Sequence, residues 1–373
     1  MNNSVWIRNP RFDLTCVMGG ALLTLLLPLL TGSFPHVLPF VFWIWLVVFE
    51  GSHFWATFSR TYFDTRFRQE NAGLLQGSLV FFAFPAAAVV IRTLTNSSWS
   101  TDLYGYFIFL WSLYHNARQH FGFLSIYARK SGNRAEAIAA YQRVIYVAIV
   151  GAQVYFAAHF KTELAIRVAP FQQWPEVVRM LLTYGPLAIT ASAAVWLVML
   201  VRRSYAESGK TALIPALYTA VCLVFYSVMF YVVAPREPFF PSPANGAQKL
   251  MLLAVMNSLF HNIQYHAIVW HYSAKRYRSE EQFGWAGRFN RGTASYLGTA
   301  LLMGAVFGLI VWNMHDWPWI NGSFTPGRDF PTLPYILFFG IIGHHFYLDQ
   351  RIWRPSRQQD LRGYLGLAPA PAV

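Results

Sequence analysis

The chain has 373 residues, of which 55% are hydrophobic and 12% are charged, and its formal net charge is +13. Ordinary soluble domains carry roughly 25% charged residues, so the composition excludes a typical soluble fold. The two cysteines, Cys16 and Cys222, stand alone inside apolar segments. This excludes a disulfide framework and a zinc ribbon.

Apolar stretches of about 20 residues, the length that crosses a bilayer as a helix, recur along the whole chain. We therefore expect an all-α, polytopic membrane bundle with residues 1–362 as a single integral membrane domain. Residues 363–373 are rich in Gly, Ala and Pro and are expected to form a disordered tail. The ten predicted spans are 14–31, 37–58, 73–91, 103–127, 138–159, 178–201, 212–234, 248–273, 294–313 and 333–350.

Basic residues divide unevenly between the two sides of this predicted bundle. If the N-terminus is cytoplasmic, 21 lysines and arginines fall on the cytoplasmic side and 7 on the other. Such a bias is the signature of the positive-inside rule. It predicts that both termini are cytoplasmic, in a membrane of the bacterial inner-membrane type. The positive charge is thus explained by topology, and we expect no nucleic-acid partner.

A nine-residue motif occurs twice, as SLYHNARQH at 112–120 and as SLFHNIQYH at 258–266. A shorter similarity links GSHFW at 51–55 with GHHFY at 343–347. Together these similarities indicate a possible internal duplication.

Eight histidines lie inside four of the predicted spans, where an ionisable side chain is costly and is a functional candidate by default. An arginine or lysine follows His53 by seven residues, His120 and His266 by nine, and His345 by six. At 1.5 Å per residue, these four lie about 9–14 Å from the inner ends of their helices. The shared depth predicts a metal site. Its candidate ligands are His53, His115, His120, His261, His266, His271, His344 and His345.

Three charged residues accompany these histidines and are candidates for a direct part in the chemistry. Glu50 precedes His53 by one turn, Asp349 follows His345 by one turn, and Arg118 lies in the middle of a span. Glu50 could act as a ligand or base, and Asp349 could bind the metal or support His345. Arg118 could pair with a carboxylate or with an anionic group of a substrate. Histidines five residues apart lie about 140° apart around a helix. The two histidines of each nonapeptide could therefore flank one wide site or bind separate metals, or one could orient the other.

The histidine pattern resembles that of the membrane histidine-box oxygenases, the desaturase and hydroxylase group. The pairs at 115 and 120 and at 261 and 266 match the HxxxxH form of the box, and His344 with His345 supplies an HH pair. No histidine precedes that HH pair by three or four positions, so the third box is incomplete. The resemblance implies two irons at the cytoplasmic side. Weaker similarities point to bacterial carotene-cleaving dioxygenases and to haem A synthase.

Imidazole ligands suit iron, zinc, copper or nickel, and a dry site rich in histidine fits non-haem iron best. We expect one or two iron ions, dioxygen as co-substrate and a lipophilic substrate that enters from the membrane lipid. Electrons would come from a ferredoxin-like partner, because no flavin, haem-attachment or iron–sulfur motif is visible. The alternatives are a haem-binding redox protein or haem-modifying enzyme, a carotenoid-cleaving dioxygenase, and a metal or proton transporter.

Overall fold

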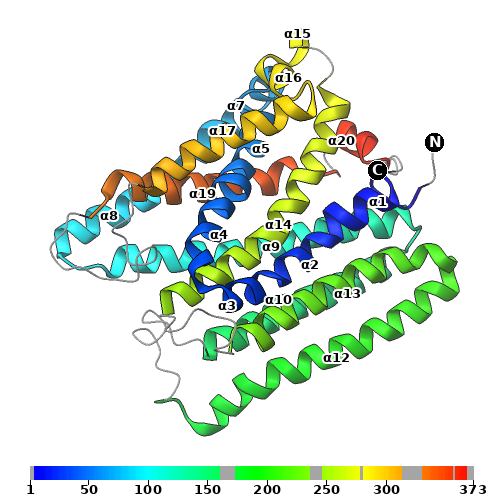
Figure 1. Cartoon of the computed structure of the whole chain (residues 1–373). Coiled ribbons are helices and arrows are strands. Elements are labelled where there is room, and N and C mark those ends of the chain that lie inside the picture. Colours follow the sequence, from blue (N-terminus) through cyan, green and yellow to red (C-terminus); the bar gives the residue numbers. More distant parts are fainter. Residues whose placement is uncertain are drawn as a thin grey trace. The chain divides into compact units, whose positions relative to one another are not determined.

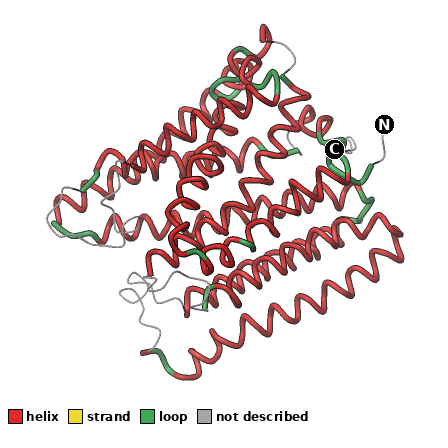
Figure 2. Tube along the Cα trace, in the orientation of Figure 1, coloured by secondary structure: helices red, strands yellow, loops and turns green. Residues whose placement is uncertain are grey.

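The computed structural model describes residues 4–159, 173–235, 246–277, 280–312, 330–355 and 358–367. Every regular element in these ranges is helical, and no strand occurs among them (Figure 2). The prediction of an all-α fold is therefore confirmed.

Helices cover all ten stretches that were predicted to span a membrane, within the described residues. The four long single helices are α9 (Trp99–Lys130), α10 (Ala135–His159), α12 (Glu176–Ser208) and α14 (Gly246–Arg276). The others, in chain order, are α1 (Pro10–Phe12), η1 (Asp13–Met18), α2 (Gly19–Leu25), α3 (Leu27–Ser33), η2 (Pro35–Val37), α4 (Leu38–Ile44), η3 (Trp45–Gly51), α5 (Ser52–Thr61), α6 (Thr65–Glu70), α7 (Ala72–Ser78), η4 (Leu79–Phe82), α8 (Ala83–Thr95), η6 (Gly209–Ala212), α13 (Leu213–Ser227), η7 (Val228–Val233), α15 (Glu280–Phe283), α16 (Trp285–Phe289), α17 (Thr293–Trp312), α19 (Thr332–Ile352) and α20 (Gln359–Tyr364).

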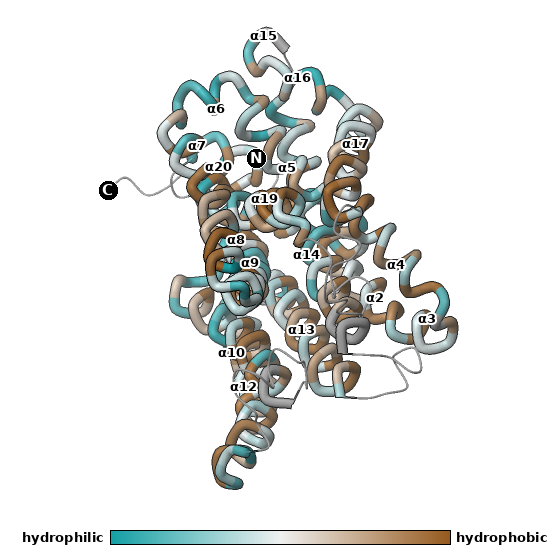
Figure 3. The backbone as a smooth tube through the Cα atoms, turned by 90° about the vertical axis from the view of Figure 1, so that its left-hand side faces the viewer, coloured by the Kyte–Doolittle hydropathy of each residue, from teal (hydrophilic) through white to brown (hydrophobic). Residues whose placement is uncertain are grey.

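Six helical stretches in the described part of the chain are long and apolar enough to cross a membrane. Two of these stretches contain α8 and α17, and Figure 3 shows the hydrophobic residues along both helices. The helices that carry most of the histidines, α9, α14 and α19, are not among the six, and each has several polar residues in its middle. The six are Pro10–Ser33, Leu38–Thr61, Ala72–Thr95, Ala135–Phe156, Glu176–Val233 and Thr293–Trp312.

The chain forms two compact units, each assembled from separate segments (Figure 1). Unit 1 comprises residues 1–38, 116–261 and 365–367, and unit 2 comprises residues 39–115, 262–364 and 368–373. Two continuous helices, α9 and α14, belong partly to each unit. The division falls between His115 and Asn116 in α9 and between His261 and Asn262 in α14, which is the same position in both copies of the nonapeptide.

Within unit 1, α10 packs against α12 and α13. Asp13 is fully buried at the start of this unit, and its carboxylate accepts hydrogen bonds from the backbone N–H of Ile7 at 2.7 Å and from the hydroxyl of Tyr127 at 3.0 Å. These bonds fix the first turns of the chain against α9, because a buried carboxylate must be hydrogen-bonded. Leu365, inside the predicted tail, is buried, whereas residues 368–373 lie outside the described residues.

Within unit 2, α17 packs against η3 and α5. The element η3 is a π-helix, a rare form that is frequent at functional sites, and it ends at Gly51, two residues before His53. A Cβ atom on Gly51 would lie 2.8 Å from the Cα of Gly304 in α17. Glycines at both positions let the two backbones approach closely, as small residues do in membrane helix pairs. This contact sets the position of the helix that carries His53.

Adding one methyl group at Gly304 is expected to destabilise the protein, because a Cβ atom there would overlap the backbone carbonyl of Val47. Such overpacking costs about 1–3 kcal/mol, so Gly304→Ala should lower the melting temperature measured in detergent. Gly298 is the matched control, because it lies on the same helix with open space around it. Equal melting temperatures for Gly304→Ala and Gly298→Ala would contradict the close approach of η3 and α17.

Candidate metal centre

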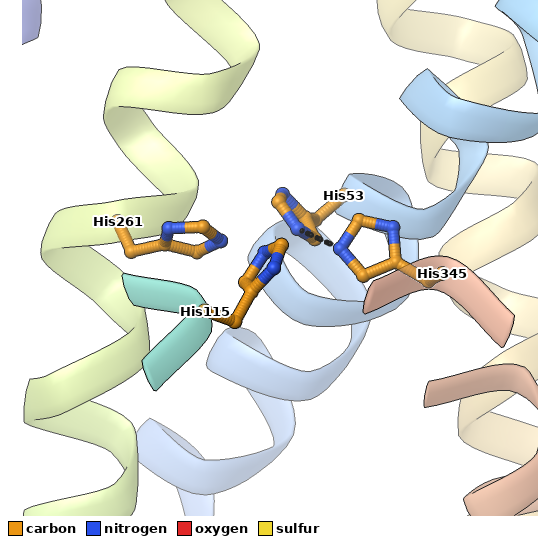
Figure 4. Close-up of side chains that lie close together, drawn as sticks. All are labelled: His53, His115, His261 and His345. Carbon is orange, nitrogen blue, oxygen red and sulfur yellow. Dashed lines mark hydrogen bonds between the residues drawn. The ribbon is translucent and has the colours of Figure 1, made fainter. Parts of the chain in front are cut away.

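Four buried histidines, His53, His115, His261 and His345, place one nitrogen each within 4.8 Å of one another (Figure 4). Each comes from a different helix: α5, α9, α14 and α19, respectively. Three of them belong to unit 2, and His261 is the residue of α14 that directly precedes unit 2. Their exposed fractions range from 0% for His345 to 4% for His115. Four buried imidazoles this close together could hold a transition-metal ion.

The rings of His53 and His345 are hydrogen-bonded within this group, with their Nε2 atoms 2.7 Å apart. A metal with bonds of about 2.0–2.1 Å to both nitrogens would hold them roughly 3 Å apart, depending on the angle at the metal. A small movement of the two rings therefore separates the observed hydrogen bond from joint coordination. The ring of His115 is also close, with its centroid 5.2 Å from that of His345.

Hydrogen bonds around Thr57 fix which nitrogen of His345 carries the proton. Thr57 Oγ1 donates to Asp349 Oδ1 at 2.6 Å, so its oxygen is left to accept from His345 Nδ1 at 2.8 Å. Nδ1 is then protonated, and Nε2 presents a lone pair to the centre of the histidine group. A hydrogen-bonded Nδ1–H that leaves Nε2 as donor atom is the usual arrangement of a metal-ligating histidine.

Asp349 lies beside the four-histidine group and supports it. Its Oδ1 also accepts a hydrogen bond from the hydroxyl of Tyr265 at 2.6 Å. Its Oδ2 lies 3.7 Å from Nε2 of His345 and 4.0 Å from Nε2 of His115. Asp349 lies one turn after His345 on α19, as predicted. Its carboxylate accepts the hydrogen bond from Thr57 and lies near the rings of His345 and His115.

Three of the other predicted ligands lie outside the group, with hydroxyl groups bound to their rings. His120 contacts the hydroxyls of Tyr218 at 2.9 Å and Tyr226 at 3.0 Å. His266 contacts Ser52 Oγ and the hydroxyl of Tyr296, each at 2.9 Å. His344 contacts the hydroxyl of Tyr62 at 2.8 Å and stacks on Phe58 and Tyr62. These contacts satisfy both ring nitrogens of His120 and His266 without a metal. They satisfy only Nε2 of His344, whose Nδ1 is buried with no hydrogen-bond partner among the described residues.

The remaining predicted site residues also lie outside the four-nitrogen group. His271 is buried further along α14. Glu50, in η3, accepts a hydrogen bond from the side-chain amide of Asn262 at 2.7 Å. Arg118 is exposed in unit 1, where it donates to the hydroxyl of Tyr146 at 3.2 Å and lies over the ring of Phe121. An exposed Arg118 does not support the prediction that it anchors a substrate inside the site.

The structure brings His115 and His261, the first histidine of each nonapeptide, together with His53 and His345. The distances counted along the sequence predict the same depth for the second histidines, His120 and His266, instead. The reason is the length of the helices. His115 and His261 each lie 15 residues before the end of α9 or α14, whereas His53 lies 8 residues before the end of α5 and His345 lies 7 before the end of α19. The distance of a residue from the end of its helix therefore gives its depth relative to other helices only if all the helices end at the same level.

Two supporting residues, Thr57 and Tyr265, were missing from the set of candidates. Thr57 follows His53 by one turn on α5, and Tyr265 immediately precedes His266 on α14. The spacing of His53 and Thr57 is the same i,i+4 relation that linked His345 with Asp349. The same spacing therefore indicates Thr57 when hydroxyl side chains are included with carboxylates.

Removing the hydroxyl of Thr57 is expected to weaken metal binding by about 10- to 100-fold, the usual effect of losing a residue that orients a ligand. Thr57→Val keeps the shape of the side chain while freeing Nδ1 of His345. Thr61→Val is the matched control, since Thr61 is equally buried and its hydroxyl bonds only to the carbonyl of Thr57 in its own helix. Competition with a metal chelator measures both affinities, and equal values would show that Thr57 does not orient His345.

No protein-family model matches the chain, and neither a curated protein nor a solved structure matches it.

Proposed function

We propose that this protein is an integral membrane non-haem iron enzyme that uses dioxygen to oxidise a lipophilic substrate. The observation that carries the proposal is the convergence of four buried imidazoles, one from each of four helices, on a single point. Keeping four ionisable rings out of water is costly, and coordination of one ion offsets that cost for all four together.

The ligand set favours iron over the other metals that imidazole binds. Structural zinc sites are closed by four ligands, and they commonly include cysteine. Non-haem iron(II) in oxygenases keeps positions open beside its protein ligands. Four imidazoles on such an ion would leave room for dioxygen. One ion accounts for this group, because its four nitrogens all lie within 4.8 Å of one another.

Haem fits this arrangement less well. A porphyrin supplies four nitrogen ligands in its own plane, so the protein adds at most two axial ligands on opposite faces. Four imidazoles directed at one point leave no plane for the macrocycle. Three of the other predicted histidines, His120, His266 and His344, contact hydroxyl groups instead.

Two reaction classes fit a lipophilic substrate, and their electron balance separates them. Cleavage of a C=C bond by dioxygen puts one oxygen atom on each carbon and gives two carbonyl products, with no external electrons. Hydroxylation of a C–H bond puts one oxygen atom in the product and releases the other as water, which requires two electrons and two protons. The second class needs a ferredoxin-like donor, whereas the first proceeds without one.

The membrane setting of this proposal includes ten spans, with both termini cytoplasmic in a bacterial-type inner membrane. All ten predicted stretches are helical, and α9, α14 and α19 would be the spans whose polar residues face the site. An internal duplication is supported by the nonapeptides, since His120 and His266 both contact a tyrosine hydroxyl through Nδ1 at 2.9 Å. In a simple tandem repeat, the shorter motif would stand on the same side of the nonapeptide in both copies. Here it precedes the first nonapeptide, at 51–55, and follows the second, at 343–347.

Nitric oxide, a stable substitute for dioxygen at iron(II), tests this proposal in the absence of any substrate. Protein purified anaerobically and loaded with iron(II) should give the half-integer-spin EPR signal of an iron–nitric oxide adduct. His345→Ala, treated identically and desalted to remove unbound iron before nitric oxide is added, should give no such signal. A wild-type protein that retains iron(II) but gives no adduct signal would show that the site has no open position, and the oxygenase proposal would fail.

A further inference from the structure

We propose that a second site, at the end of α5, binds a phosphate group through Arg60. The site is a cavity of about 500 Å³ in unit 2, lined by residues from α5, α6, α14 and α19 and from the segment around Gln358. It contains none of the four metal-site histidines, and its assignment does not depend on the proposed function.

Arg60 is the cavity residue that would bind the phosphate group. Its side chain is buried, with 2% of the residue exposed. The guanidinium contacts two aromatic rings, with its carbon 4.0 Å from the centre of the Trp353 ring and 4.3 Å from that of Tyr272. These two rings also pack edge to face on each other. Arginine stacks favourably on such rings. A guanidinium that contacts aromatic rings through its carbon still presents the N–H donors along its edges for hydrogen bonding.

Those edges are incompletely satisfied. Nη2 donates to the amide oxygen of Gln358 at 2.9 Å. Nε and Nη1 are buried and have no hydrogen-bond partner among the residues that the structure describes. A buried donor without a partner is more costly on a charged group than on a neutral one. An oxyanion that enters the cavity and displaces the neutral amide of Gln358 would supply both the missing acceptors and the missing negative charge.

The acidic residues of the cavity form ion pairs with arginines other than Arg60. Asp64 accepts from Arg276 at 3.0 Å and from the hydroxyl of Tyr277 at 3.1 Å. Burial raises the pKa of Tyr277 well above its ordinary value, so the phenol stays a donor. Arg276 also lies 3.4 Å from Asp360. Five arginines and three acidic residues line the cavity, which leaves an excess of positive charge: Arg60, Arg66, Arg276, Arg351 and Arg354 against Asp64, Glu70 and Asp360.

The chemistry of this site indicates a phosphate group. The planar fork of arginine matches phosphate oxygens in pairs, and the cavity has room for a substituent on the phosphate. Arg60 is also the penultimate residue of Leu38–Thr61, a stretch long and apolar enough to cross a membrane. The end of such a stretch is where the phosphates of lipid headgroups lie. A lipid headgroup and a free phosphate ion are therefore the two sources that an experiment must separate.

The full-length protein in phospholipid-free detergent allows both sources to be tested. Inorganic phosphate is titrated by calorimetry, and phosphatidic acid is compared with diacylglycerol, which lacks the phosphate, by native mass spectrometry. We expect saturable binding of phosphatidic acid or of inorganic phosphate, and no binding of diacylglycerol. Arg60→Gln should weaken that binding by about tenfold or more, since charge-assisted hydrogen bonds are lost. Arg203→Gln, which removes an exposed arginine of unit 1, should leave it unchanged.

The wild-type measurement keeps the proposal falsifiable even if Arg60→Gln does not fold. Binding of phosphatidic acid alone identifies a lipid headgroup as the source, and binding of both probes identifies the phosphate itself as sufficient. Failure of the wild-type protein to bind either probe would overturn the assignment. So would an Arg60→Gln protein that binds as tightly as the wild type. Neither result depends on whether the histidine group holds a metal.

Discussion

Replacing His345 by alanine is expected to abolish metal retention. Its Nε2 faces the Nε2 of His53 at 2.7 Å, and its Nδ1 is held by Thr57 at 2.8 Å. Binding free energies of about 10–16 kcal/mol for four-ligand sites correspond to roughly 3 kcal/mol per ligand. The loss of one imidazole should therefore lower the affinity by about 100-fold or more. Elemental analysis after dialysis against a weak chelator measures this directly.

His120→Ala is the matched control for that experiment. His120 is as buried as His345, with 0% exposed, and lies in the same nonapeptide as His115. Its ring contacts two tyrosine hydroxyls, and it is not one of the four grouped histidines. Its replacement should lower stability and leave the metal content near that of the wild type. Loss of metal from His120→Ala equal to that from His345→Ala would mean that the ligand set is assigned incorrectly.

Removing dioxygen is expected to stop turnover completely, and labelled dioxygen should mark the product. Cells that express the wild-type protein under isotopically labelled dioxygen should contain a lipophilic product that carries the label. Cells that express His345→Ala should lack it, because the metal that would react with dioxygen is no longer held. Mass spectrometry of the extracted lipids detects the difference whichever lipid is the substrate.

The number of labelled atoms also separates the two reaction classes. Cleavage of a C=C bond places one labelled oxygen in each of two products, whereas hydroxylation places one in a single product and one in water. Formation of the same product, unlabelled and in equal yield, under strict anaerobiosis would exclude the oxygenase proposal. A protein that instead moved metal ions across the membrane would give no labelled lipid in either strain.

The sequence indicated the fold class, and it singled out the histidines of the candidate site, because both depend on local composition. Long apolar stretches form helices wherever they occur, and a histidine inside such a stretch is conspicuous. Its i,i+4 partner is equally local, so the spacing of residues alone places Asp349 beside His345. The members of the four-histidine group, His53, His115, His261 and His345, were all among the predicted ligands.

The sequence could not show which histidines converge, because that depends on how far each helix extends and how it packs. His115 and His120 are about 140° apart on one helix, and only the packing decides which of them faces His345. Arg118 was placed in the site on the assumption that a mid-helix charge faces inward, whereas it is exposed beside Tyr146. The close approach of Gly51 and Gly304 is likewise a property of two helices that are distant in sequence.

The most direct test of the central claim, that four imidazoles bind one metal ion, is X-ray absorption spectroscopy on the purified wild-type protein after its metal content has been measured. We predict about one iron ion per chain, with an imidazole shell at roughly 2.0–2.2 Å and no sulfur ligand. The optical spectrum of the same sample should lack the Soret band of haem. A protein with no more metal than His345→Ala, or an ion whose shell lacks imidazole scattering, would contradict the claim.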